Sequence, residues 1–181
     1  MPSYRVVYGL RREGALVIIG VIGDAHCGDL EAKLAEEVGK NIACSKAILI
    51  CGGLGGVMEA ACRGAKSQGG LTVGVLPGFS QREANPYLDI PIVTGLDQAR
   101  NVVIVRSSQA VIALGGGYGT LSEIAFALKM NVPVVGINTW TLGKEGKGIK
   151  DIIPAKDAKE AVEKAIKAVR EKGEPFGEGT N

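Results

Sequence analysis

Four glycines, a threonine and a glutamate stand together in the segment GGGYGTLSE, Gly115–Glu123, directly after the apolar run QAVIAL. A glycine loop that opens a helix can hold a phosphate, because the helix start offers free N–H groups and the positive end of the dipole. The glutamate would then be left for chemistry on the bound molecule. A second interpretation fits the same letters, since Thr120 and Glu123 have the spacing of a capping box that only starts a helix. The segment alone leaves both interpretations open.

Two further loops of small residues follow apolar runs of the β type. GDAHCGD, Gly23–Asp29, follows the first run, and GGLGG, Gly52–Gly56, follows the second. In an open parallel sheet, ligands bind outside the carboxyl ends of the strands, where the strand order reverses. Two glycine loops that each open a helix, one at Gly56 and one at Thr120, therefore predict a site for a phosphate-bearing ligand.

The elements that must position these loops alternate between apolar β-type runs and helical patterns. This alternation is typical of an α/β fold, here a doubly wound, Rossmann-like parallel sheet with helices on both faces. The near-continuous apolar character of the runs fits strands that are buried on both faces. The predicted strands are Leu16–Ile22, Ala47–Cys51, Leu71–Leu76, Ala110–Leu114 and Val132–Ile137. We expect them in the spatial order 3-2-1-4-5.

Helical patterns fill the segments between these strands and the end of the chain. Asp29 is the expected N-cap of the first helix, with Leu34, Val38 and Ile42 as its inward stripe. Asp157 is the expected N-cap of the last helix. The predicted helices are Asp29–Ala43, Gly56–Ser67, Leu96–Arg106, Thr120–Met130 and Asp157–Lys172.

The length of the chain fits one domain with a sizeable core. We expect a single nucleotide-binding domain over residues 1–181, with its core at 15–140 and a C-terminal helix at 157–172. The short segment Ile149–Ile153 is the expected edge strand before that helix.

Composition and charge argue against several classes of protein. The net charge of +2 gives no electrostatic footprint for nucleic acid or for an acidic membrane. No apolar run reaches transmembrane length, and the first twelve residues lack the apolar stretch of a signal peptide, so we expect a cytoplasmic protein. The four cysteines form no C-x-x-C pair and His26 is the single histidine, so we expect no metal site.

Two common nucleotide-binding motifs are missing from the sequence. There is no G-x-x-x-x-G-K-[ST], which argues against a P-loop nucleotidase. There is also no strict G-x-G-x-x-G after the first strand, and no acidic residue ends the second strand to hold a ribose. A standard NAD enzyme is therefore not expected.

Taken together, these segments resemble the Lonely Guy phosphoribohydrolase superfamily, in the branch near the molybdenum cofactor carrier proteins. The resemblance rests on GGLGGVMEAACRGA, VGVLP, ARN, GGGYGTLSE and VPVVGI, and it covers about Leu16–Asn138. Its hallmark is a glycine loop ending in G-L-M, followed later by P-G-G-x-G-T-x-x-E. Members of the superfamily cleave cytokinin nucleotides to a free base and ribose 5′-phosphate, whereas the neighbouring branch carries molybdenum cofactor.

The resemblance also implies roles for individual residues. Arg100 matches the family arginine and Glu123 matches the glutamate that closes the motif, so both are catalytic candidates. Met58 matches the end of the first glycine loop. The residues expected to bind the phosphate or nucleotide are Gly52, Gly53, Gly56, Gly115, Gly116, Gly117, Tyr118, Gly119 and Thr120.

The sequence departs from the family pattern at four positions. Gly115 replaces the motif proline, and Cys51 stands where a first glycine is usual. Glu59 replaces the glycine after the motif methionine, and Asn101 replaces the lysine that commonly follows the arginine. These departures leave the phosphate loop intact and fall on the base pocket.

Several other residues have both a functional and a structural interpretation. Gly23 and His26 follow the first strand and are candidates for ligand contact, although a lone histidine without partners also fits a structural role. Tyr118 can stack on a ligand or cover the rim of the site. Cys27 fits a small buried filler better than a nucleophile, and Met58 fits the core.

Two functions remain open from the sequence. In the enzyme reading, Gly116–Thr120 binds the phosphate of a nucleoside 5′-monophosphate and Arg100 orients the sugar phosphate. Glu123 then stabilises the cationic sugar or positions water as the N-glycosidic bond is hydrolysed. In the carrier reading, the same loop holds molybdenum cofactor as cargo, and no cofactor is required for chemistry. A third possibility is a non-catalytic sensor, for which the sequence contains no recognisable motif.

Both readings imply the same kind of partner. The expected ligand is a phosphorylated small molecule, either a nucleotide or a pterin-like compound, rather than nucleic acid or a membrane. The resemblance and the prevalence of closed two-fold symmetry predict a homodimer or a higher even homo-oligomer.

Overall fold

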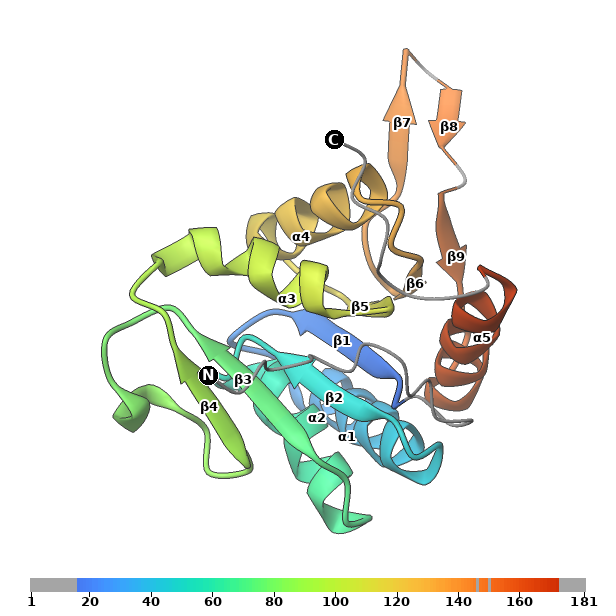
Figure 1. The fold of residues 1–181 in the computed structure, drawn as a ribbon. Coiled ribbons are helices and arrows are strands. Elements are labelled where there is room, and N and C mark those ends of the chain that lie inside the picture. The colour runs from blue at the N-terminus through green and yellow to red at the C-terminus, as the bar shows by residue number, and fades with distance from the viewer. Residues whose placement is uncertain (1–15, 146, 150, 173–181) are drawn as a thin grey trace, which may run out of the picture.

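A computed structural model describes residues 16–145, 147–149 and 151–172 of the chain (Figure 1). Its centre is a parallel sheet in which seven strands follow the order β4-β3-β2-β1-β5-β6-β9. The strands are β1 (Ile18–Gly23), β2 (Ile48–Cys51), β3 (Thr72–Leu76), β4 (Ile90–Val93), β5 (Ala110–Leu114), β6 (Val134–Ile137) and β9 (Ile152–Pro154). The order reverses between β1 and β5, which places the carboxyl ends of these two strands side by side.

The five predicted strands and their order are confirmed as β3-β2-β1-β5-β6. The sheet is wider than predicted, because β4 extends it beside β3 and β9 extends it beside β6. The edge strand predicted at Ile149–Ile153 lies slightly later, at Ile152–Pro154. Strand β4 is only four residues long and contains Pro91, which weakens its strand pattern in the sequence.

Helices cover both faces of the sheet (Figure 1). One face packs against α1 (Asp29–Cys44), α2 (Gly56–Ser67) and α5 (Ala158–Glu171). The other packs against α3 (Asn101–Ser107) and α4 (Tyr118–Lys129). Side chains of one strand alternate between these two cores, because successive residues of a strand point to opposite faces. In β1, for example, Ile19 and Val21 lie in the first core and Ile22 lies in the second.

Helices α1 and α2 approach each other closely, and glycine makes this approach feasible. A Cβ atom at Gly39 of α1 would collide with the backbone oxygen of Ala61 in α2. A Cβ atom at Gly64 of α2 would collide with the backbone oxygen of Glu36 in α1. Only residues without side chains fit at these two positions, so the spacing of the two helices is fixed.

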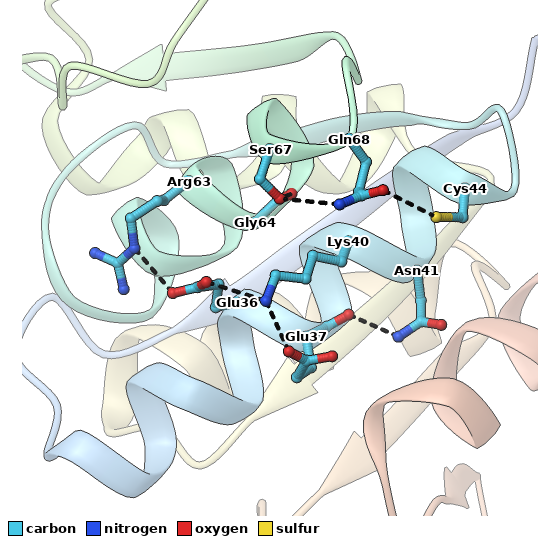
Figure 2. Close-up of polar contacts among 9 residues, drawn as sticks. All are labelled: Glu36, Glu37, Lys40, Asn41, Cys44, Arg63, Gly64, Ser67 and Gln68. Carbon is cyan, nitrogen blue, oxygen red and sulfur yellow. Dashed lines mark hydrogen bonds and ion pairs between the residues drawn. The ribbon is translucent and has the colours of Figure 1, made fainter.

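Charged side chains flank the contact between α1 and α2 (Figure 2). Arg63 of α2 donates from Nε to Glu36 of α1 at 2.9 Å, and Lys40 forms ion pairs with Glu36 at 3.2 Å and Glu37 at 2.8 Å. Partly exposed pairs of this kind contribute about 0–1 kcal/mol each. The close packing of the backbones, more than these charges, therefore holds the two helices together.

The helix starts differ from the predictions at two places. Gly28, not Asp29, is the N-cap of α1, and Asp29 is its first residue. Helix α4 begins at Tyr118, two residues before the predicted start at Thr120, and its N-cap is Gly117. Thr120 thus lies inside the first turn, which rules out the capping-box interpretation of Thr120 and Glu123. The N-cap of α5 is confirmed, since the side chain of Asp157 accepts a hydrogen bond from the Glu160 N–H at 2.8 Å.

The described fold also contains several short elements, among them a 3₁₀ turn at Gln81–Glu83. The helix predicted at Leu96–Arg106 is split into a 3₁₀ turn, Asp97–Arg100, and α3. Strands β7 (Leu142–Lys144) and β8 (Lys147–Ile149) form an antiparallel hairpin. Among residues 16–145, 147–149 and 151–172, no helix has the length and apolar character needed to span a membrane.

Candidate functional site

The candidate site is a cavity of about 150 Å³ at the carboxyl ends of the central strands. Its lining comes from the end of β1 and the loop after it, from the loop after β2, from the 3₁₀ turn before α3, and from the first turns of α4. The strand order reverses at this point, as is usual for ligand sites in open parallel sheets. The predicted site residues that line this cavity are Gly23, Gly52, Arg100, Gly119, Thr120 and Glu123.

Arg100 and Glu123 form an ion pair at the inner wall of the cavity. Their Nη1 and Oε1 atoms are 3.6 Å apart, and the exposed fractions of the two residues are only 7% and 6%. Gly52 makes room for the arginine, because a Cβ atom there would lie 2.6 Å from Nη2. The two catalytic candidates are therefore brought together by three separate elements: the loop after β2, the 3₁₀ turn and helix α4.

Burial is the largest cause of the pKa shifts of Arg100 and Glu123. Removal from water raises the pKa of Glu123 to about 7, although the neighbouring Arg100 charge opposes the rise. Burial likewise lowers the pKa of Arg100, and Glu123 opposes that shift. Near neutral pH the carboxyl group of Glu123 can therefore hold or release a proton.

The guanidinium of Arg100 is only partly satisfied by the protein. Nη1 donates to Oδ1 of Asn101 at 2.5 Å, and the Nε–H is buried without a partner among the described residues. A buried donor left unpaired costs about 1–3 kcal/mol. Arg100 also lines the cavity, so a ligand with anionic or carbonyl oxygens would supply acceptors that the protein does not give its guanidinium.

Asn101 connects Arg100 to the start of α4. Its Nδ2 donates to Oγ of Ser122 at 3.3 Å, and that hydroxyl donates to the backbone oxygen of Gly119 at 2.7 Å. The lysine that is common at this position in the family would have no oxygen to accept from Arg100. Asn101 therefore holds the guanidinium of Arg100 in place through an uncharged side chain.

Asp24 joins the starts of two helices. Its Oδ1 accepts a hydrogen bond from the Gly117 N–H at the N-cap of α4, at 2.8 Å. Its backbone oxygen accepts from the Val57 N–H in the first turn of α2, at 3.0 Å. Asp24 is not among the predicted site residues, although its place directly after the first parallel strand was a usable signal.

The two glycine loops contribute to the site in different ways. Gly53 and Gly56 have positive φ values of 75° and 60°, and neither lines the cavity. Gly56 packs against the backbone of Asp24 and Ala25, where a side chain would collide. These two glycines shape the turn between β2 and α2, while Gly52 alone lies at the cavity.

Residues of the phosphate loop, Gly115–Thr120, line two different cavities. Gly119 and Thr120 face the cavity with Arg100, whereas Gly115 and Gly116 line a second, more open cavity of about 300 Å³ with Asn138, Thr139 and Trp140. Gly117 and Tyr118 belong to neither lining and form the ridge between the two cavities.

The remaining candidates have smaller roles. His26 is exposed and is absent from the lining of the cavity beside Arg100. Met58 is buried in the core and also lines that cavity, next to Gly52. Cys51 and Cys62 are free thiols whose sulfur atoms are 3.5 Å apart in the core, and Cys27 is partly buried. No group of three metal-binding side chains occurs in the part of the chain that the structure describes.

Comparisons with known proteins place this site in a family. The sequence model of the SLOG cluster4 family matches residues 16–170, which is most of the chain. The chain belongs to the SLOG cluster4 family. The resemblance to the Lonely Guy superfamily is therefore confirmed.

Solved structures of similar proteins support the same branch of this SLOG family. The molybdenum cofactor carrier protein of Chlamydomonas reinhardtii is 38% identical, with a TM-score of 0.76, over 86% of this chain and 99% of that one. The molybdenum cofactor binding protein of Rippkaea orientalis is 35% identical, with a TM-score of 0.76, over 86% of this chain and 98% of that one. An uncharacterised protein of Archaeoglobus fulgidus is 54% identical over 114 residues, which is 63% of this chain and 75% of that protein.

Proposed function

We propose that this SLOG protein binds molybdenum cofactor, or a closely similar phosphorylated pterin, and carries it without breaking a bond. The observation that carries this proposal is the buried guanidinium of Arg100, which lines a cavity shared with the first turns of α4 and whose Nε–H has no partner in the described part of the chain. An arginine donor and a helix start are complementary to a phosphate group.

The phosphate has suitable donors on one side of the cavity. The first N–H groups of an α-helix have no intrahelical acceptor, and in α4 these belong to Tyr118, Gly119 and Thr120. Gly119 and Thr120 line the same cavity as Arg100. A phosphate between them would receive backbone hydrogen bonds from one side and a guanidinium hydrogen bond from the other.

The similar proteins support carriage rather than chemistry. Two relatives that match most of this chain at 35% and 38% identity are described as binding or carrying molybdenum cofactor. The Arg100 pocket and the glycine loop at α4 are the features of this chain that fit such a cargo. The predicted cytoplasmic location and the predicted phosphorylated partner are part of the same proposal.

The test is loading of the purified protein with molybdenum cofactor released from a donor enzyme. After gel filtration, the retained cofactor is oxidised to its fluorescent pterin and quantified. Arg100→Lys keeps the positive charge but lacks the Nε–H donor, so we expect retention to fall at least about tenfold, as for loss of a charged hydrogen bond.

The matched control is Arg106→Lys, since Arg106 is exposed on α3, the helix that follows Arg100. This variant should retain cofactor like the native protein. Equal retention by the native protein and Arg100→Lys, or no retention by the native protein, would refute the proposal.

A second candidate function is hydrolysis of the N-glycosidic bond of a nucleoside 5′-monophosphate. Glu123 favours it, because a carboxyl group with a pKa of about 7 lies in the same cavity and can stabilise a cationic sugar or position water. Incubation with AMP should then release adenine and ribose 5′-phosphate, and Glu123→Gln should lower the rate about a hundredfold. Absence of product from every nucleoside monophosphate leaves carriage as the function.

A further inference from the structure

The cavity beside Arg100 is too small for a whole ligand of the proposed kind. Its volume of about 150 Å³ is below the range of roughly 300–1,000 Å³ that is typical of small-molecule sites. A phosphate and part of a sugar fill such a space. The planar ring of the ligand must therefore lie elsewhere.

A second cavity of about 300 Å³ lies across the ridge of the phosphate loop. Gly115 and Gly116 form one side of it, and Asn138, Thr139 and Trp140 follow β6 and form the other. The two sides are joined where the Thr139 hydroxyl donates to the backbone oxygen of Gly115 at 2.6 Å. This second cavity is thus built from the ends of β5 and β6.

Two aromatic side chains stand at the ridge between the cavities. Tyr118 is 82% exposed, and its ring centroid lies 5.8 Å from that of Trp140, with 36° between the planes. Trp140 is held in place because its Nε1–H donates to the backbone oxygen of Gly117 at 3.2 Å. A large aromatic side chain with this exposure leaves its apolar ring faces in water, and a planar ring stacked on it would bury that area.

We propose that the second cavity binds the planar heterocycle of the ligand, stacked against Trp140 and Tyr118, while its phosphate lies at the start of α4. This inference rests on the proposed phosphate site and adds the ring to it. Asn138 is exposed beside the cavity, and its amide both donates and accepts, as the polar edge of a pterin or a purine requires.

Trp140 provides a direct readout, because it is the only tryptophan of the chain. The two probes are ribose 5′-phosphate, which has no ring, and GMP, whose guanine shares the polar edge of a pterin. Base–aromatic stacking contributes about 1–3 kcal/mol per base, so GMP should bind at least about fivefold more tightly. GMP should also quench the Trp140 fluorescence, and ribose 5′-phosphate should not.

The variant that tests the stacking is Tyr118→Ala, in which the affinity ratio of GMP to ribose 5′-phosphate should fall several-fold, because only Trp140 is then left to stack on the ring. Phe79→Ala is the matched control, since Phe79 is 88% exposed but lies outside both cavities, and this variant should keep the native ratio. Equal affinity for the two probes, unchanged fluorescence, or a ratio that survives in Tyr118→Ala would refute the ring site alone. Failure of both probes to bind the native protein would refute the phosphate site as well.

Discussion

The carboxylate of Asp24 accepts a hydrogen bond from the Gly117 N–H at 2.8 Å, so an internal anion already occupies the start of α4. The same residue also caps α2 through its backbone oxygen. A ligand phosphate that approaches the first turn of α4 therefore meets a negative charge that belongs to the protein. This charge limits the affinity for an anionic ligand, and it would favour release of the ligand under the proposed carrier function.

Asp24→Asn should tighten the binding of ribose 5′-phosphate about tenfold, equivalent to about 1.4 kcal/mol. The amide oxygen can still accept from the Gly117 N–H, while the repulsion between the carboxylate and the phosphate is lost. Isothermal titration calorimetry at low salt measures the change. Asp29→Asn, an exposed position five residues later, should leave the affinity nearly unchanged. Weaker binding in Asp24→Asn would mean that the carboxylate contacts the ligand directly.

Glu123→Gln should change how stability depends on pH. The folded protein binds the Glu123 proton more tightly than the unfolded chain, because the pKa rises from 4.5 to about 7 on folding. The native protein therefore loses stability as pH rises from about 4.5 to about 7, and the glutamine variant does not.

Urea unfolding of both proteins at pH 5 and pH 8 measures this effect. Relative to the native protein, Glu123→Gln should gain about 2–3 kcal/mol between the two pH values. Glu37→Gln, an exposed position on α1, should show no comparable gain. A constant difference between native protein and Glu123→Gln would show that burial does not control this carboxyl group.

Gly39→Ala should destabilise the protein by about 2–3 kcal/mol, the usual cost of overpacking a close contact. The new methyl group would collide with the backbone oxygen of Ala61, and α1 and α2 would have to separate. Urea unfolding gives the free energy. Lys33→Ala is exposed on the same helix and should stay within about 0.5 kcal/mol of the native value. A similarly small loss in Gly39→Ala would show that the two helices can shift freely.

We expect the protein to be a homodimer, with a mass of about twice 18.8 kDa by light scattering. Strand β4 is at one edge of the sheet and exposes Ile90, Ile92 and Val93, and an apolar edge strand readily pairs with a second copy. Ile92→Lys should shift the protein toward the monomer mass. A native protein that is monomeric at micromolar concentration, or a variant that stays dimeric, would contradict this interface.

Much of the fold was readable from the sequence because its signals are local. Apolar runs such as Ala110–Leu114 are buried on both faces, so they predict central strands without any knowledge of the partners. The edge strands were harder, since Ile90–Val93 is half exposed and its pairing with β3 depends on a distant part of the chain. Helix starts also depended on distant groups, because the N-cap of α4 receives its acceptor from Asp24.

The site was predictable in part for the same reason. The motif glycines and the resemblance pointed to Arg100, Glu123 and the phosphate loop. The structure brings Arg100, Glu123 and the end of that loop, Gly119 and Thr120, to one cavity. The sequence could not show that the residues of the phosphate loop line two different cavities. This separation depends on Trp140, which follows β6 and donates a hydrogen bond to the loop. Nothing in the spacing of GGGYGT shows which of its glycines faces which side.

The central pair of strands has a consequence for synthesis on the ribosome. The Ile18 N–H donates to Oε1 of Gln109 at 2.5 Å across 91 positions of the chain, and β1 can pair with β5 only when both have been made. A nascent chain that ends after α3 already contains Asp24, Gly52 and Arg100, yet it has no cavity, because β5 and the start of α4 are missing. Parallel pairing of distant strands is also slow. The cavity beside Arg100 therefore forms only after α4 has emerged, so an unfinished chain has no site at which a ligand could bind.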